Sequence, residues 1–301
     1  RTDPAHVPVP EYIADRLTSR RDIARYYDAL HLQDREMRKI LDALEQSGQA
    51  ENTVVIYIGD HGRGLPREKR WCYDAGCHVP LIVRWPGRTE PGAREENVVS
   101  GVDIAPPILS IAGIEVPEHY QGQAFLGPYA ADERRLYCLS ARDRMGEAYD
   151  RVRTLRDKRF LYIRNYYPDL PYCQRIEYME RHNTVTLMRE LYAHGQLNDA
   201  QSLWFAERKP SEELYDCQAD PDNVRNLVDS PEHRETLERM RGALEATLAE
   251  TPDLGELSER ELIDRGIVCD DHLKKFLKMS ASLPPYQRIG PELTVVEQPK
   301  S

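Results

Sequence analysis

Apolar residues near the start of the chain recur at the spacing of an amphipathic helix. Between positions 19 and 47 they fall three or four residues apart in most cases, at Ile23, Tyr26, Leu30, Met37, Ile40, Leu41 and Leu44. Ser19 and Asp22 have the spacing of a capping box at the start of this helix, and Gly48 is placed to end it. The pattern therefore predicts a helix over residues 19–47.

A continuous apolar run follows this helix. Residues 52–58 have the sequence NTVVIYI, and such an unbroken β-branched run is typical of a strand covered on both faces. A long helix that leads into such a strand favours an α/β fold with a parallel sheet. Ligands of open α/β sheets gather at the carboxyl ends of the strands, which directs attention to residues 59–62, GDHG.

The rest of the chain alternates between short strand patterns and helix patterns. Strands are predicted at 79–85, 135–140 and 152–166, and helices at 102–113, 185–207 and 231–250. Beyond residue 252 the chain is polar and irregular, with closely spaced prolines over residues 284–299. The change of pattern near residues 128–150 predicts a domain boundary there. Residues 1–140 then belong to an α/β domain, and residues 141–301 form a smaller α+β subdomain with antiparallel strands, a packing helix and an irregular tail.

The composition limits the classes of protein to which the chain can belong. With 301 residues, 40% of them hydrophobic and 31% charged, it has the composition of a globular protein with a core. No stretch approaches the roughly 20 apolar residues of a membrane-spanning helix, so no membrane span is expected. A net charge of −10 argues against the basic face of a general nucleic-acid binder, so no nucleic-acid partner is expected. One local cationic site would still suffice for an anionic small substrate.

Asp60 and His61 stand directly after the predicted strand, where a carboxylate and an imidazole are suited to bind a metal ion. Carboxylate oxygens favour Ca²⁺, Mg²⁺ or Mn²⁺, whereas an imidazole nitrogen favours softer divalent ions. Two ligands are too few for a metal site, so further carboxylates must come from elsewhere. The alternative interpretation is a polar turn that only joins the strand to the next loop.

The polar loop over residues 63–78 contains several cationic side chains. A lysine or arginine close to a metal site is suited to bind a tetrahedral oxyanion, lysine as a point charge and arginine as a bidentate fork. For most of Arg63, Arg67 and Arg70, the better interpretation is a solvated run of charges.

Several short motifs, in order along the chain, closely resemble the sulfatase family of the alkaline-phosphatase superfamily. They are Asn52–Gly62, Lys69 with Tyr73, Gly76, Val79–Gly87, Val102–Pro106, Ala112–Ile114, Gln121-Gly122, Glu213–Asp216, Asp220-Pro221 and Asn226-Leu227. Residues 143–216 resemble the bacterial sulfamidase or heparan-type branch. The resemblance implies an α/β alkaline-phosphatase-like sandwich, with a mixed, mostly parallel sheet between helices. Residues 1–140 would be the C-terminal part of its catalytic domain.

The resemblance also implies roles for individual residues. Asp60 matches an acidic metal ligand of the family, and His61 stands where the family has Asn or His, also a metal ligand. The metal is then Ca²⁺, with Mn²⁺ and Mg²⁺ as alternatives. Lys69 matches the lysine that contacts the sulfate group and so has a catalytic and substrate-binding role. Arg142 and Arg144 follow the strand predicted at 135–140 and are substrate-binding candidates for an acidic sugar, with surface charge as the favoured alternative.

Two further residues of these motifs receive no catalytic role. Asp103 matches a structural aspartate of the family, and the resemblance assigns no role to His78.

The nucleophile of the family is absent from this sequence. Family members oxidise a Cys or Ser of a Cys-x-Pro-x-Arg motif to formylglycine, and the nearest match, residues 138–142 (CLSAR), lacks the proline. We therefore expect this chain to be about the C-terminal 60% of a sulfatase, by domain size. Its expected partners are a missing N-terminal part of the same fold and a sulfated small molecule or saccharide. A chain that opens at Arg1 leaves a periplasmic, secreted or cytoplasmic location open.

Three functions follow as hypotheses. The first is a metal-dependent hydrolase of sulfate esters or sulfamates that uses the formylglycine of the missing part. The second is a phosphodiester or phosphonate monoester hydrolase of the same superfamily, which His61 in place of Asn keeps open. The third is a binding or scaffold remnant that has lost its nucleophile.

Overall fold

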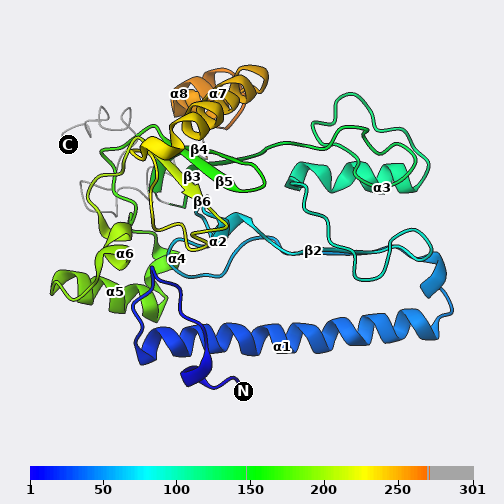
Figure 1. The fold of residues 1–301 in the computed structure, drawn as a ribbon, viewed down its shortest axis with the longest axis horizontal. Helices are drawn as coiled ribbons and strands as arrows, with labels where there is room; N and C mark the ends of the chain where they lie inside the picture. The colour runs from blue at the N-terminus through cyan, green and yellow to red at the C-terminus, as the bar shows by residue number, and fades with distance from the viewer. Residues whose placement is uncertain (147, 270, 272–301) are drawn as a thin grey trace.

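The protein combines one long helix with two small sheets and is of the mixed α/β class that the sequence predicts. The computed structural model describes residues 1–146, 148–269 and 271. Helix α1 (Leu17–Gln46) lies below the two-stranded sheet of β1 (Val55–Ile58) and β2 (Leu81–Arg84), as Figure 1 shows. A four-stranded sheet with its covering helix lies on the side of the N-terminal end of α1. None of the described helices is long and apolar enough to cross a membrane.

Helix α1 matches the predicted helix except at its start. It begins at Leu17, so Ser19 lies inside the helix, where it is fully buried, and the predicted capping box is wrong. The Asp22 carboxylate instead accepts hydrogen bonds from the backbone N–H and the hydroxyl of Thr184, at 3.0 and 2.8 Å. Gly48 ends the helix as predicted, with φ at +70°, a value that suits glycine.

Strands β1 and β2 pair antiparallel, with Val55 opposite Arg84 and Ile58 opposite Leu81. The sequence predicted a mostly parallel sheet, and within the described residues no parallel pair is present. The physical reason lies in the connection. Parallel neighbours need a crossover, usually a full helix, whereas the loop over residues 59–80 contains only the single turn α2 (Asp74–Cys77).

The four-stranded sheet is antiparallel, with its strands in chain order. They are β3 (Cys138–Met145), β4 (Ala148–Arg156), β5 (Phe160–Asn165) and β6 (Glu212–Asp216). The single strand predicted over 152–166 is divided by a tight turn. There the Asp157 carboxylate accepts hydrogen bonds from the backbone N–H groups of Arg159 and Phe160, at 2.7 and 2.6 Å.

Beside α1 and the single turn α2, the described residues form six further α-helices. They are α3 (Ala105–Ile111), α4 (Glu177–Glu180), α5 (Asn183–Ala193), α6 (Asp199–Ser202), α7 (Arg234–Glu250) and α8 (Glu259–Asp264). Helix α3 lies apart from the four-stranded sheet, toward the C-terminal end of α1 (Figure 1). Helix α7 buries Leu237, Met240 and Leu244 against one face of the sheet. The helix predicted over 185–207 ends early, because Gly195 turns the chain with φ at +65°. The stretch beyond residue 252 was predicted to be irregular, which is wrong for helix α8, where Ser258 caps the first turn. The proline-rich residues 284–299 lie outside the described residues.

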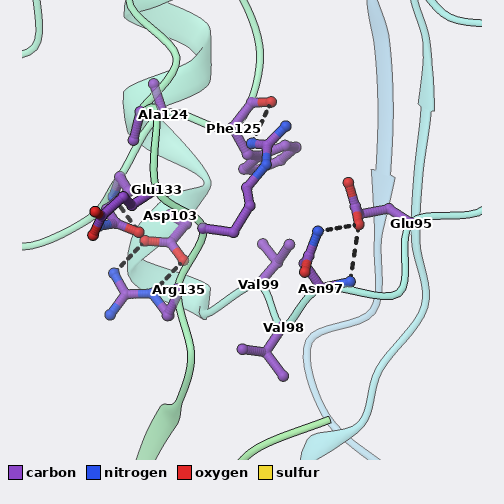
Figure 2. A pocket seen from close by; sticks show the side chains of 12 residues that line it. Glu95, Asn97, Val98, Val99, Asp103, Ala124, Phe125, Glu133 and Arg135 are labelled. Carbon is purple, nitrogen blue, oxygen red and sulfur yellow. Dashed lines mark hydrogen bonds and ion pairs between the residues drawn. The ribbon is translucent and has the colours of Figure 1, made fainter.

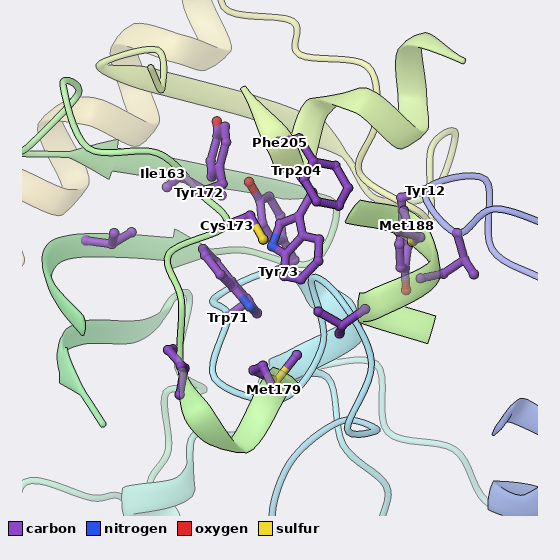
Figure 3. Packing of buried hydrophobic residues seen from close by; sticks show 14 of the residues in the cluster. Tyr12, Trp71, Tyr73, Ile163, Tyr172, Cys173, Met179, Met188, Trp204 and Phe205 are labelled. Carbon is purple, nitrogen blue, oxygen red and sulfur yellow. The ribbon is translucent and has the colours of Figure 1, made fainter. Parts of the chain in front are cut away.

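The opposite face of the sheet is covered by aromatic side chains, several of them from outside the sheet. Figure 3 shows Trp71 and Tyr73 from the 59–80 loop among Tyr172, Trp204 and other buried residues. The Trp71 and Trp204 rings meet edge to face, with centroids 6.3 Å apart. The loop that leaves β1 is therefore part of the core under the four-stranded sheet. We call residues 59–80 the Lys69 loop.

A buried carboxylate fixes the Lys69 loop to strand β6. Glu213 is 1% exposed and accepts hydrogen bonds from the hydroxyls of Tyr73 and Tyr215, at 3.1 and 2.6 Å. It also accepts one from the Asn165 amide at 2.7 Å. Burial, together with the Glu213 charge, raises the pKa of both tyrosines, so the phenols stay protonated and donate.

Cationic side chains add a second set of links to the same loop. Arg156 of β4 binds Asp74 through two hydrogen bonds of 2.9 and 3.0 Å. The Arg67 guanidinium lies 3.9 Å from the ring centre of Tyr73 and donates a hydrogen bond to the backbone carbonyl of Asn223. Arg67 is 1% exposed, so the interpretation of this residue as a solvated charge is wrong.

Asp103 organises the segment that leads to β3. Figure 2 shows its carboxylate facing Arg135, whose guanidinium donates two hydrogen bonds of 2.7 and 2.6 Å. The backbone N–H groups of Ser100 and Gln123 donate two more, at 2.9 and 2.8 Å. Burial raises the pKa of Asp103, but these four donors outweigh it and hold the pKa below its ordinary value. Asp103 thus has the structural role that the family resemblance implies.

We predict that Asp103→Asn lowers the free energy of unfolding by roughly 1–3 kcal/mol, because a buried charged acceptor is lost. The lowered pKa gives the sign of the pH effect. The Asp103 contribution is complete above the unfolded pKa, near 3.8, and is lost as the pH falls through the lower folded value. Urea unfolding across this acid range should show a smaller loss of stability in the variant. The exposed Asp132→Asn is the matched control, and equal acid sensitivity of Asp103→Asn and wild type would contradict the prediction.

We also predict that Gly76→Ala opens the Lys69 loop. A Cβ at Gly76 would collide with the backbone carbonyl oxygens of Trp71 and Glu68, which cannot move without shifting the loop. Overpacking of this kind typically costs about 1–3 kcal/mol. Gly101→Ala is the control, because a Cβ there meets no atom within 4 Å. Thermal unfolding of both variants checks the prediction, and an unchanged midpoint for Gly76→Ala would refute it.

Candidate active site

Asp60 and His61 lie side by side where strand β1 ends. The Asp60 side chain is 85% exposed, and its Oδ2 lies 3.0 Å from His61 Nε2. The other ring nitrogen, His61 Nδ1, lies 2.7 Å from the carbonyl oxygen of Gly62. The backbone holds this corner in place, because Gly62 N–H donates to the Gly76 carbonyl at 3.1 Å.

These contacts set the tautomer of His61. A carbonyl oxygen only accepts, so Nδ1 must carry the hydrogen and donate to Gly62. In the neutral ring, Nε2 then presents its lone pair to the Asp60 carboxylate, another acceptor. Two facing acceptors are stabilised by a cation or a proton between them, so the pair fits as two ligands of a divalent cation. Among the described residues, no group of three or more His, Cys, Asp or Glu side chains could hold a metal by itself.

An open cleft of about 590 Å³ lies beside His61. Its other walls come from helix α1, through Tyr26, Tyr27 and Leu30, and from the extended segment over residues 8–10. The imidazole therefore stands at the margin of a space large enough for a small organic ligand.

Lys69 lies further along the same loop and points toward helix α4. Its backbone N–H donates to the Arg63 carbonyl at 2.8 Å, and its half-buried side chain places Nζ 5.0 Å from the ring centre of Tyr178. In the part of the chain that the structure describes, this ammonium contacts no carboxylate, Asp60 included. The structure thus brings Asp60 and His61 into contact but gives no contact between this pair and Lys69.

The other cations of the loop differ from one another. Arg63 binds Glu68 through two hydrogen bonds of 2.6 and 2.7 Å, so it is paired rather than merely solvated. Arg70 adopts φ at +77°, which is uncommon outside glycine, and its Cζ lies 4.5 Å from the Tyr178 ring centre.

The two predicted substrate arginines lie in strand β3. Arg142 is fully buried, donates to Asp150 at 2.6 Å and lies 4.4 Å from the Trp71 ring centre. This burial corrects both interpretations of Arg142, because the side chain is neither a surface charge nor open to a substrate. Arg144 pairs with Tyr149 in the sheet, but its side chain lies outside the described part of the structure.

Tyr178 and His182 were not found by sequence reasoning. Their rings lie 5.2 Å apart, and both approach Gly64 of the Lys69 loop, where an added Cβ would be 3.1 Å from His182 Cε1. Burial lowers the pKa of His182, and the charges of Lys69 and Arg70 lower it further against the opposing effect of Asp22. The sequence signal is weak, since the two residues only precede a predicted helix.

Comparisons with known proteins agree with the motifs of the Lys69 loop. A family model described as Sulfatase matches residues 5–114, the segment that contains Asp60, His61 and Lys69. An ulvan-active sulfatase of Formosa agariphila is 41% identical over 257 residues, which cover 85% of this chain and 43% of that protein. An N-acetylglucosamine-6-O-sulfatase of Bacteroides thetaiotaomicron is 26% identical over 234 residues, 76% of this chain and 36% of the relative. The chain spans less than half the length of both relatives.

A solved structure shares the fold. A phosphonate monoester hydrolase of Agrobacterium radiobacter superposes with a TM-score of 0.57 at 19% identity, over 83% of this chain and 52% of that one. At this identity the likeness concerns the fold alone. Family model, sequence relatives and the local motifs agree, and the chain belongs to the sulfatase family.

Proposed function

We propose that the protein hydrolyses sulfate esters or sulfamates with the help of a divalent cation. The observation that carries the proposal is the Lys69 loop itself. It places the Asp60 carboxylate 3.0 Å from His61 Nε2 and contains an ammonium group, Lys69, without a carboxylate partner among the described residues. An acceptor pair for a cation and a free ammonium for an oxyanion are two of the parts that sulfuryl transfer uses, beside the nucleophile.

Asp60 and His61 are proposed as two ligands of the metal, with Ca²⁺ favoured and Mn²⁺ or Mg²⁺ as alternatives. When bound, such a cation would polarise a sulfate oxygen. The Nδ1–H bond to Gly62 keeps the imidazole ring oriented with Nε2 as the ligand atom. The remaining ligands would come from residues outside the described part of this chain.

Lys69 is proposed to bind a sulfate oxygen and to stabilise the charge that develops on the transferring sulfuryl group. The half-buried position of its side chain strengthens such an interaction, because water screens the charge less there. The ring of Tyr178 supports the ammonium from one side and leaves its hydrogen-bond donors available.

The nucleophile belongs to a separate part of the proposal. This sequence holds no Cys-x-Pro-x-Arg motif, so the formylglycine that attacks sulfur would be supplied from outside it. The proposed substrate is a sulfated saccharide, because the similar proteins include an ulvan-active sulfatase and an N-acetylglucosamine-6-O-sulfatase. The fold shared with a phosphonate monoester hydrolase supports phosphonate or phosphodiester hydrolysis as a second candidate.

We predict that Lys69→Ala, made in the protein as its natural gene encodes it, lowers kcat/KM for sulfate-ester hydrolysis by at least about 100-fold. The reason is the loss of one charged group from the transition state. Lys158→Ala in the exposed β4–β5 turn is the matched control and should retain full activity. Steady-state kinetics on 4-nitrophenyl sulfate measure both, and near-wild-type activity of Lys69→Ala would remove Lys69 from the site.

We predict that exhaustive chelation abolishes the activity and that Ca²⁺, Mn²⁺ or Mg²⁺ restores it. Asp60→Asn and His61→Ala should each raise the metal concentration needed for half-maximal activity by about 10- to 100-fold, the usual effect of weakening a metal shell. The rise in melting temperature on metal addition is a second readout that needs no substrate. Full activity after chelation would refute the metal site.

A comparison of an aryl sulfate with an aryl phosphonate separates the two candidate reactions. We expect the larger kcat/KM for the sulfate. A larger kcat/KM for the phosphonate would favour the second candidate. No turnover of either substrate by the natural protein would favour the third hypothesis, a binding or scaffold protein without a nucleophile.

A further inference from the structure

Two cations of the Lys69 loop converge on one aromatic ring. Lys69 Nζ lies 5.0 Å and Arg70 Cζ 4.5 Å from the ring centre of Tyr178, and the His182 ring centroid lies 5.2 Å from the same ring. Tyr178 is 37% exposed, so this group of side chains is open to solvent on one side. We call Arg70, Tyr178 and His182, together with Lys69, the Tyr178 cluster.

Within the described residues, neither Lys69 nor Arg70 of the Tyr178 cluster forms an ion pair, and Asp22 is the acid whose charge acts on His182. Arginines around it are paired: Arg63 with Glu68, Arg156 with Asp74, and Arg189 with Glu180. Within the described residues, Arg70 forms no ion pair, and its Nε is buried without a hydrogen-bond partner. A buried Nε that has lost water without gaining an acceptor carries a cost in free energy.

The backbone is strained where it presents Arg70. A φ of +77° at a residue with a long side chain costs free energy and persists only when the surroundings impose it. Here the neighbouring Trp71 is locked in the core, and its N–H donates to the Glu68 carbonyl at 3.0 Å. The Arg70 guanidinium reaches the β3–β4 turn, where a Cβ on Gly146 would lie 3.4 Å from its Nη1. The strained backbone thus places the Arg70 guanidinium between the Tyr178 ring and the β3–β4 turn.

His182 completes the cluster from a second, independently fixed element. It is the residue before helix α5, which Asp22 of α1 holds through the backbone N–H and hydroxyl of Thr184. Gly64, which has no side chain, lets the imidazole approach the Lys69 loop closely. Three elements therefore meet at this point: the Lys69 loop, α4 and the start of α5.

We propose that Arg70, Tyr178 and His182 bind a second anionic group of the substrate, a carboxylate or another sulfate on the same saccharide. This inference rests on the proposed function, in which Lys69 contacts the sulfate that is cleaved. The Arg70 guanidinium offers the bidentate donor geometry that carboxylates and sulfates share. His182 supplies a further N–H donor, and the Tyr178 ring offers a flat face to the sugar. The enzyme would thereby select substrates with two negative groups.

The test measures selectivity in the natural full-length protein. Substrates are 4-nitrophenyl sulfate, which has one anionic group, a disulfated glucosamine and a sulfated uronic acid. Arg70→Asn removes the cation and keeps a residue that tolerates positive φ, and Arg70→Lys restores the charge without the fork. We expect Arg70→Asn to lower kcat/KM about 10- to 100-fold for one or both dianionic sugars, the usual effect of losing a charged hydrogen bond. The value for 4-nitrophenyl sulfate should stay within about threefold, and Arg70→Lys should recover part of the loss.

His182→Gln is the second variant, in case Arg70→Asn disturbs the loop, and it should shift selectivity in the same direction. Arg181→Asn is the matched control, since this arginine directly follows helix α4, has a 71% exposed side chain and pairs with Glu177. The sugar whose kcat/KM falls in the variants identifies the anion: the sulfated uronic acid indicates a carboxylate, and the disulfated glucosamine indicates a second sulfate. An equal loss on all three substrates in both variants, or a wild-type enzyme without preference for dianionic sugars, would overturn the subsite and leave the proposed function intact.

A failure of the proposed function has a different signature, namely no turnover of any sulfate by the wild type. Isothermal titration calorimetry with the disulfated glucosamine then tests the proposed anion subsite independently of catalysis. Binding by the wild type that Arg70→Asn weakens about 10-fold or more would support the subsite, and equal binding by both would overturn it.

Discussion

The buried Glu213 carboxylate is the constraint on which the rest of this structure depends. A carboxylate in the core is tolerated only when donors surround it, and here the donors come from β5, β6 and the Lys69 loop. One of them, the Tyr73 hydroxyl, lies only a few residues after Lys69 in the chain. The demand of one buried charge for hydrogen bonds therefore holds the proposed catalytic loop against the four-stranded sheet.

The remaining links act in the same direction. Asp74 is held by Arg156, Trp71 packs against Trp204, and Arg67 donates to the Asn223 carbonyl, so the loop is attached to three different neighbours. Such redundancy permits positive φ values at Arg67 and Arg70, which isolated loops would relax. The rigid side of the loop faces the core, and the unpaired cations Lys69 and Arg70 lie on the side toward Tyr178.

The elements with strong local patterns were predictable from the sequence, and the long-range partners were not. The helical spacing from Ile23 onward located α1, and the apolar run around Val55 located β1. Asp22 was misplaced as a cap because its real partner, Thr184, is remote in sequence. Arg142 was interpreted as a surface charge because nothing in the sequence indicates that Asp150, its ion-pair partner on the neighbouring strand, is buried. Asp60 and His61 could be identified from the sequence because they directly follow β1, whereas only tertiary packing brings His182 to the Lys69 loop.

The bond between Tyr73 and Glu213 joins positions 140 residues apart, and this separation has a consequence for synthesis. Contacts so remote in sequence form late in folding, because a long stretch of chain must first be ordered to close the loop. During translation, the Lys69 loop leaves the ribosome well before its anchor on β6 exists. The Lys69 loop can reach its final conformation only after β6 has been made. A chain terminated before β6 would therefore contain Asp60, His61 and Lys69 without the folded loop that positions them.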